Sequence, residues 1–175
     1  MPNTPTPNIN GFSISNLSLM QGEDGYVIRC KLHKAGKLLG VFFDQGDGSE
    51  YMFYPCSRYT QKEIEEILNN FPLIESEDEE LPQIHWNIGI LVDKLIEKKE
   101  LLKLFRQAKK ENKSLITVHD TEHNFDYTFM CSETMTGDKL KSELTSLTIE
   151  KGIKHFEWTR FDSEEDFNEH ISFSI

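Results

Sequence analysis

The sequence contains few cysteines and no spacing that would join them. Cys30, Cys56 and Cys131 are odd in number, lie far apart and form no C-x-x-C pair. This pattern argues against a disulfide framework and against a structural zinc site. A reducing compartment fits such cysteine usage best, so we expect a cytoplasmic protein.

Long apolar segments are missing as well. No run approaches the ~20 apolar residues that a membrane-spanning helix needs. The first residues, MPNTPTPNING, lack both the basic start and the apolar core of a signal peptide. Their Pro, Asn and Thr content predicts a flexible tail over residues 1–11. We therefore expect a soluble protein with no membrane partner.

Positive charge is scarce. The chain carries 19 Lys and Arg against 30 Asp and Glu, which gives a net charge of −11. This charge favours solubility and repels nucleic acid and anionic membranes. It is also typical of proteins that bind a basic partner or mimic the phosphates of DNA, although an ordinary solvated surface has the same composition.

The common catalytic motifs are absent. The sequence has no G-x-S-x-G, no P-loop and no G-x-G-x-x-G. Their absence removes the usual hydrolase, NTPase and dinucleotide-binding functions. The sequence therefore favours a protein that is not an enzyme, and we expect no cofactor.

Regular apolar periods are present throughout the chain. Hydrophobic residues make up 37% of the 175 residues and include twelve Phe, enough for the core of one domain over residues 12–175. Alternation with a period of two predicts antiparallel strands. They are expected at residues 12–20 with a bulge at Asn16, and at 26–33, 38–43, 51–54, 114–119, 125–131 and 155–161, with a last half-strand near residues 173–175.

Helical signals separate these strands. Thr60 and Glu63 have the spacing of a capping box, which starts a helix that Pro72 ends. A longer apolar stripe predicts a helix over roughly residues 84–110, interrupted at Lys98, and a third follows at 137–150. Because strands cluster rather than alternate with helices, we expect an α+β fold. An antiparallel sheet of the N-terminal hairpin strands and a second hairpin would pack against two to three helices.

Three short motifs occur in a characteristic order. They are the strand return GKLLG at residues 36–40, the acidic loop DQGDG at 44–48, and the helix at 88–100 that leads into a Lys-rich stretch. Over roughly residues 12–161 the chain resembles a small family of uncharacterised bacterial and phage proteins. The resemblance implies no catalytic residues. It implies an accessory role linked to phage or mobile elements.

The acidic loop at residues 44–50 has two interpretations. Its carboxylates, Asp44 and Asp47 among them, suggest a calcium site. An EF-hand, however, needs oxygen ligands at its third and fifth positions, where this loop has Gly46 and Gly48. We therefore expect a tight connection in which the glycines take positive φ and each aspartate accepts a bond from nearby backbone.

One cluster could bind a metal ion or serve acid–base chemistry. His119, Asp120 and His123 are suitable ligands for zinc, manganese or iron. They fall in a predicted hairpin rather than on one face of a helix, so a polar exposed turn is the competing interpretation. With Asp44 and Asp47 nearby in space, they would support a metal-dependent hydrolase or nuclease.

The remaining candidates form a predicted binding surface. It combines the acidic loop (Asp44, Asp47), aromatic residues of the third strand (Tyr51, Phe53) and cations of the long helix (Lys99, Lys103, Arg106). We expect a non-catalytic interaction or accessory protein that binds another protein through an acidic and aromatic surface. The alternatives are the hydrolase or nuclease, a nucleic-acid binder, and a DNA mimic; formation of a homo-oligomer stays open.

Overall fold

The computed structural model describes residues 7–56, 58–75, 83–122, 125–163, 165–167 and 172–173. It confirms the α+β fold class and divides the chain into two compact units. The first comprises residues 1–100 with 171–175, and the second comprises residues 101–170. The single domain expected over residues 12–175 stays a prediction. In the described parts, no helix is long and apolar enough to cross a membrane.

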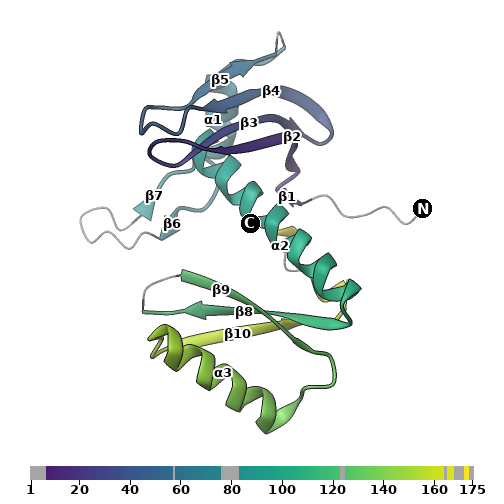
Figure 1. Cartoon of the computed structure of the whole chain (residues 1–175). Helices are drawn as coiled ribbons and strands as arrows, with labels where there is room; N and C mark the ends of the chain where they lie inside the picture. The colour runs from purple at the N-terminus through teal and green to yellow at the C-terminus, as the bar shows by residue number, and fades with distance from the viewer. Residues whose placement is uncertain are drawn as a thin grey trace. The chain divides into compact units, whose positions relative to one another are not determined.

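The first unit is built around a six-stranded sheet (Figure 1). Its order is β11-β1-β2-β3-β4-β5, and its neighbours are antiparallel except for the parallel pair β1 and β11. The bounds are β1 Asn8–Ile9, β2 Phe12–Gln21, β3 Tyr26–Lys34, β4 Lys37–Asp44, β5 Met52–Pro55 and β11 Ser172–Phe173. The predicted N-terminal tail thus contributes a short strand, and Ile9 is buried at 2% exposure. Residues 1–6 lie outside the described residues.

The backbone of the hairpins follows from a few residues. Ala35 and Gly36 both have positive φ (47° and 76°), the geometry of the two-residue turn that matches strand twist. The register of β2 against β3 shifts between Ser15 and Ser18, where Asn16 has a φ of 52°. This confirms the predicted bulge.

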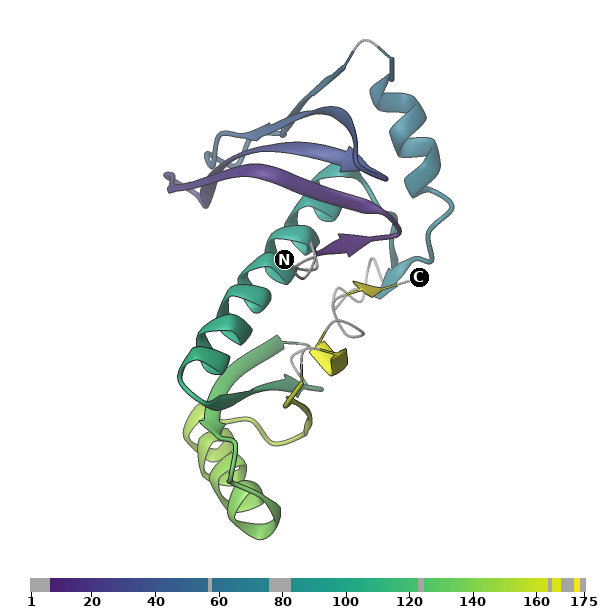
Figure 2. The same cartoon turned by 90° about the vertical axis from the view of Figure 1, so that its right-hand side faces the viewer.

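Alternation along β3 decides which face of this sheet is buried. Ile28, Cys30 and Leu32 point into the core, whereas the residues between them remain at least partly exposed. Helices α1 (Gln61–Leu68) and α2 (Ile88–Lys110) supply the other side of that core through Ile64, Leu68, Ile88, Leu91, Val92 and Leu95. One face of the sheet is therefore covered by helices, and the helices leave the opposite face open (Figure 2).

Helix α1 has the predicted capping box. The Thr60 hydroxyl accepts a hydrogen bond from the Glu63 amide at 3.2 Å, and a Glu63 carboxylate oxygen accepts one from the Thr60 amide at 2.6 Å. The helix ends at Leu68, so Phe71 lies beyond it. Phe71 packs edge-on against both Phe12 and Trp86, with ring centroids 6.1 and 5.6 Å apart.

Helix α2 is continuous, and the interruption expected at Lys98 is absent. It starts at Ile88 rather than near residue 84, because Gln83–Ile84 (β7) pairs with Ile74–Glu75 (β6). Asn87 caps the start, since its side-chain oxygen accepts a bond from the Ile90 amide at 2.9 Å. Burial lowers the pKa of the Lys98 ammonium to about 8.

The second hairpin belongs to a separate three-stranded sheet in the second unit. Its order is β10-β8-β9, with bounds Phe156–Phe161, Lys113–Asp120 and Phe125–Ser132. Helix α3 (Gly137–Lys151) covers one face and packs Leu140 and Leu144 against Ile116 and Val118 (Figure 1). On the other face lie stacked rings, with the centroids of Phe105 and Phe167 4.3 Å apart and that of Phe161 5.3 Å from Phe167.

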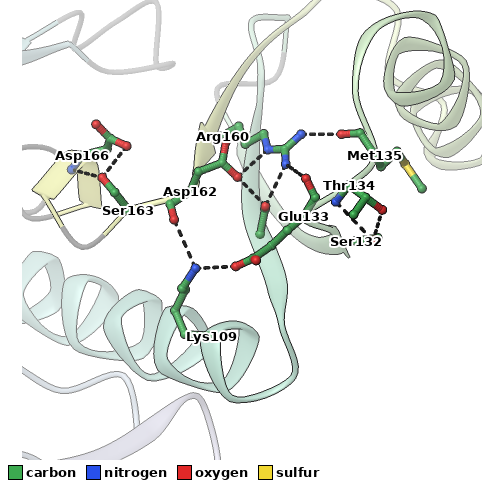
Figure 3. Close-up of polar contacts among 10 residues, drawn as sticks. Lys109, Ser132, Glu133, Thr134, Met135, Arg160, Asp162, Ser163 and Asp166 are labelled. Atoms are coloured by element: carbon green, nitrogen blue, oxygen red, sulfur yellow. Dashed lines mark hydrogen bonds and ion pairs between the residues drawn. The ribbon is translucent and has the colours of Figure 1, made fainter.

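A polar network around Arg160 connects strands and loop in this second unit (Figure 3). The guanidinium donates to the Asp162 carboxylate at 2.7 Å, to the Ser114 hydroxyl at 3.0 Å and to the Glu133 carbonyl at 2.8 Å, and also to the Met135 carbonyl. Lys109 pairs with the Glu133 carboxylate. Partial burial alone would raise the pKa of Asp162, but the hydrogen bonds from Ser114 and Arg160 and the nearby cations outweigh it and lower that pKa. Because every donor group of Arg160 has a partner, its role is structural.

The buried thiol of Cys30 makes stability sensitive to alkaline pH. Burial raises its pKa from 9.0 to about 11, and the side chain is 1% exposed. The unfolded thiol ionises first, so stability present below pH 9 is lost as pH rises through 11, by about 2 kcal/mol. We expect the urea midpoint of Cys30→Ala to fall less over this range than that of the unmodified chain. Equal slopes would show that another group is responsible.

Candidate binding face on the N-terminal sheet

Within the described residues, His119 and Asp120 of the predicted metal cluster do not converge. His119 and Asp120 are neighbours on β8, so their side chains point to opposite faces of the sheet. His119 Nδ1 lies 2.9 Å from the Asp126 carboxylate, whereas Asp120 is 2% exposed and accepts a bond from the Glu122 amide. His123 lies outside the described residues. Among the residues that are described, no group of three or more His, Cys, Asp or Glu could hold a metal ion.

The glycines of the acidic loop have the expected positive φ. Gly46 and Gly48 have φ of 63° and 77°. The Asp44 carboxylate accepts a bond from the Gly46 amide at 2.8 Å, and the Asp47 carboxylate accepts one from the Ser49 amide at 3.0 Å. The aspartates thus stabilise the turn itself.

The residues of the predicted binding surface fall in both units of the chain. Phe53 is 8% exposed and belongs to the core, which removes it from that surface, and Tyr51 packs half-buried against Phe42 with ring centroids 5.2 Å apart. Lys99 is half-buried on α2 in the first unit. Lys103 and Arg106 are exposed but belong to the second unit.

The strand residues that alternate with the buried core residues form the open face of the N-terminal sheet. We call this the outer face. Strand pairing places Ser18 beside Arg29, Phe43 and Met52 in one row, and Ser15 beside Lys31, Val41 and Tyr54 in the next. His33 and Leu38 continue it toward the β3–β4 turn. The most exposed large hydrophobic side chains of the outer face are those of Met20 at 61% and Tyr54 at 57%. The face is therefore apolar along β4 and β5, and serine-rich and basic along β2 and β3.

No acidic side chain lies in these rows of the outer face, although the chain as a whole is strongly acidic. Within the described residues, Arg29 and Lys31 have no ion-pair partner, unlike Lys94 and Lys109, which pair with Glu97 and Glu133. His33 instead lies 2.8 Å from the Ser15 hydroxyl. The positive charge of this face is thus not neutralised by the protein itself.

A hollow of about 350 Å³ lies at the end of the sheet where β4 begins and β5 ends, and it adjoins the outer face at Leu38. It is lined by Lys37, Leu38, Cys56, Arg58 and Tyr59. The Cys56 thiol donates to the Leu38 carbonyl at 3.0 Å, which fixes the segment after β5 against the start of β4. The hollow therefore combines two cations with apolar and aromatic surface.

The connections at the opposite end of the sheet are acidic. The β2–β3 turn contains Glu23 and Asp24, and the β4–β5 loop contains Asp47 and Glu50. The two connections are joined where the Asp24 amide donates to the Gly46 carbonyl at 2.7 Å. The sheet is thus electrically polarised along its strands, from an acidic end to a basic one.

No protein-family model, no curated protein and no solved structure matches the chain at a significant level. The resemblance to uncharacterised bacterial and phage proteins therefore rests on the short motifs alone.

Sequence reasoning missed most of the outer face for a specific reason. In β5 both alternating sets are apolar or aromatic, so Met52 and Tyr54 look as suitable for a core as Tyr51 and Phe53. The charged residues of β3 distinguish the two faces. Arg29 and Lys31 on β3 mark the solvent side, and strand pairing transfers that side to Tyr54.

Proposed function

We propose that this chain is a non-catalytic binding protein that recognises an acidic partner through the outer face of its N-terminal sheet. The observation that supports this most is an open sheet face on which apolar side chains lie beside cations without ion-pair partners among the described residues. Apolar surface supplies most of the affinity of a protein interface, and charge complementarity supplies its selectivity and association rate.

This proposal keeps the interaction function expected from the sequence, but the expected partner is acidic rather than basic. The total charge of −11 favours a basic partner. Electrostatic complementarity, however, acts over about 8–10 Å at physiological salt, so the local charge of a face decides what it binds. Arg29 and Lys31 make that local charge positive.

Selection of peptides from a random displayed library tests the proposal. We expect the chain to recover peptides in which Asp or Glu alternates with apolar residues. Tyr54→Ser and Arg29→Glu should each weaken binding about tenfold or more, because Tyr and Arg dominate such interfaces. The matched controls are Tyr26→Ser, since Tyr26 is 58% exposed outside the rows of the face, and Arg106→Glu on the second unit. Failure to enrich any acidic peptide, or equal losses in the control variants, would contradict the proposal.

A further inference from the structure

We propose that the hollow lined by Lys37, Leu38, Cys56, Arg58 and Tyr59 is an anchor site for a carboxylate side chain of an acidic, extended protein segment. The inference deepens the proposed function and rests on it. It assigns the place beside the outer face where the partner's charge is bound, and it identifies the partner as protein rather than nucleic acid.

The first support is the electrostatics of the hollow. Lys37 and Arg58 both line it, and neither has an ion-pair partner among the described residues. Arg58 can hold both oxygens of a carboxylate through its planar guanidinium, and Lys37 adds a second positive charge to the lining. The nearby acidic residue Glu63 is already engaged with Thr60.

The second support is what surrounds the hollow. Leu38 lines it and also continues the outer face, where Val41 and Tyr54 are paired across β4 and β5. A segment that places one carboxylate in the hollow would lay its following side chains over this apolar surface. Met52, which accepts a bond from the Tyr54 hydroxyl at 3.2 Å, adds a flexible side chain that adapts to different partners.

The charge distribution of the sheet and the exposure of its aromatic rings favour a protein partner over nucleic acid. Binding of single strands needs a groove of cations that tracks several phosphates and exposed rings on which successive bases stack. Here Tyr54 is the exposed ring of the face, while Phe43 is half-buried. The acidic loops at the opposite end of the sheet would repel the remainder of a phosphate backbone.

Nuclear magnetic resonance titration of the full chain tests the assignment. The probes are an acidic peptide, Ac-Glu-Leu-Asp-Leu-Glu-Tyr-amide, its twin with Gln and Asn in place of the acids, and the single strand dT12. We expect the acidic peptide to shift the amides of Lys37, Leu38 and Tyr59 together with those of Met52 and Tyr54. It should also protect Cys56 from alkylation. The uncharged twin should bind at least about tenfold more weakly, because it lacks the charge-assisted hydrogen bonds.

Variants separate the anchor from the face. Arg58→Gln should weaken the acidic peptide about tenfold and abolish protection of Cys56, whereas Arg106→Gln should change neither. If the peptide binds the outer face but Arg58→Gln has no effect, the hollow is not the anchor and the proposed function still stands. If the peptide shifts no amide of the face, both are contradicted. Tighter binding of dT12 than of the peptide would overturn the choice of a protein partner.

Discussion

Replacing Gly46 by alanine is expected to lower the free energy of unfolding of the N-terminal unit by about 3 kcal/mol, since a strained backbone and a clash add together. Gly46 has a φ of 63°, which L residues with a side chain adopt at a cost. A Cβ atom there would also lie 2.7 Å from the Tyr26 carbonyl carbon and 2.8 Å from the Val27 amide nitrogen. Both contacts are with strand backbone, which cannot move aside without disturbing β3.

A matched variant in the same loop isolates the clash. Gly48 also has positive φ, at 77°, but a Cβ atom there would approach only the carboxylate of Asp24 at 3.0 Å, and that side chain can rotate. Gly48→Ala should therefore cost about 1–2 kcal/mol, from the backbone alone. Amide hydrogen exchange of β3 and β4 measures both losses within the N-terminal unit. Equal losses in the two variants would show that packing against β3 contributes nothing.

Replacing Arg160 by alanine is expected to destabilise the second unit by about 3 kcal/mol, because the buried Ser114 hydroxyl and two carbonyls of the loop between β9 and α3 lose their partner. The side chain of Arg160 is 12% exposed. Its removal leaves the Glu133 and Met135 carbonyls without this hydrogen-bond donor. The hydroxyl of Ser114, a fully buried residue, also loses the hydrogen bond that it accepts from the guanidinium. Ser114 lies on β8 and Arg160 on β10, whereas Glu133 and Met135 lie in the loop between β9 and α3, so the loss would loosen this loop from the sheet.

Lysine at the same position gives a sharper test than alanine alone. Arg160→Lys keeps the positive charge but cannot reproduce the planar fork of donors. We expect it to recover less than half of the loss when exchange of the β8 and β9 amides is measured. Full recovery would mean that charge alone, rather than the geometry of the guanidinium, holds the network.

Several elements could be predicted from the sequence because their causes are local. The capping box of Thr60 and Glu63, the turn at Ala35 and Gly36, and the loop of Gly46 and Gly48 each depend on residues within a few positions of one another. Alternation with a period of two likewise determines where strands run. These features give the α+β class and the geometry of the acidic loop.

Other features depend on which surfaces meet, and the sequence does not contain that information locally. Helix α2 is unbroken although its apolar stripe is interrupted at Lys98, because its first half packs on the N-terminal sheet and its second half contributes to the other unit. The second hairpin likewise pairs with β10, which is distant in the chain, and forms its own sheet.

The candidate site shows the same division. Alternation over β5 and Tyr51, the residue before it, placed Tyr51 with Phe53 on one face and Met52 with Tyr54 on the other. Only the tertiary structure decided which pair is buried, because α1 and α2 cover one side of the sheet and leave the other open. It also decided the local charge of the open face, since pairing places Arg29 and Lys31 beside the apolar residues of β4 and β5 while the acids of the loops lie at one end.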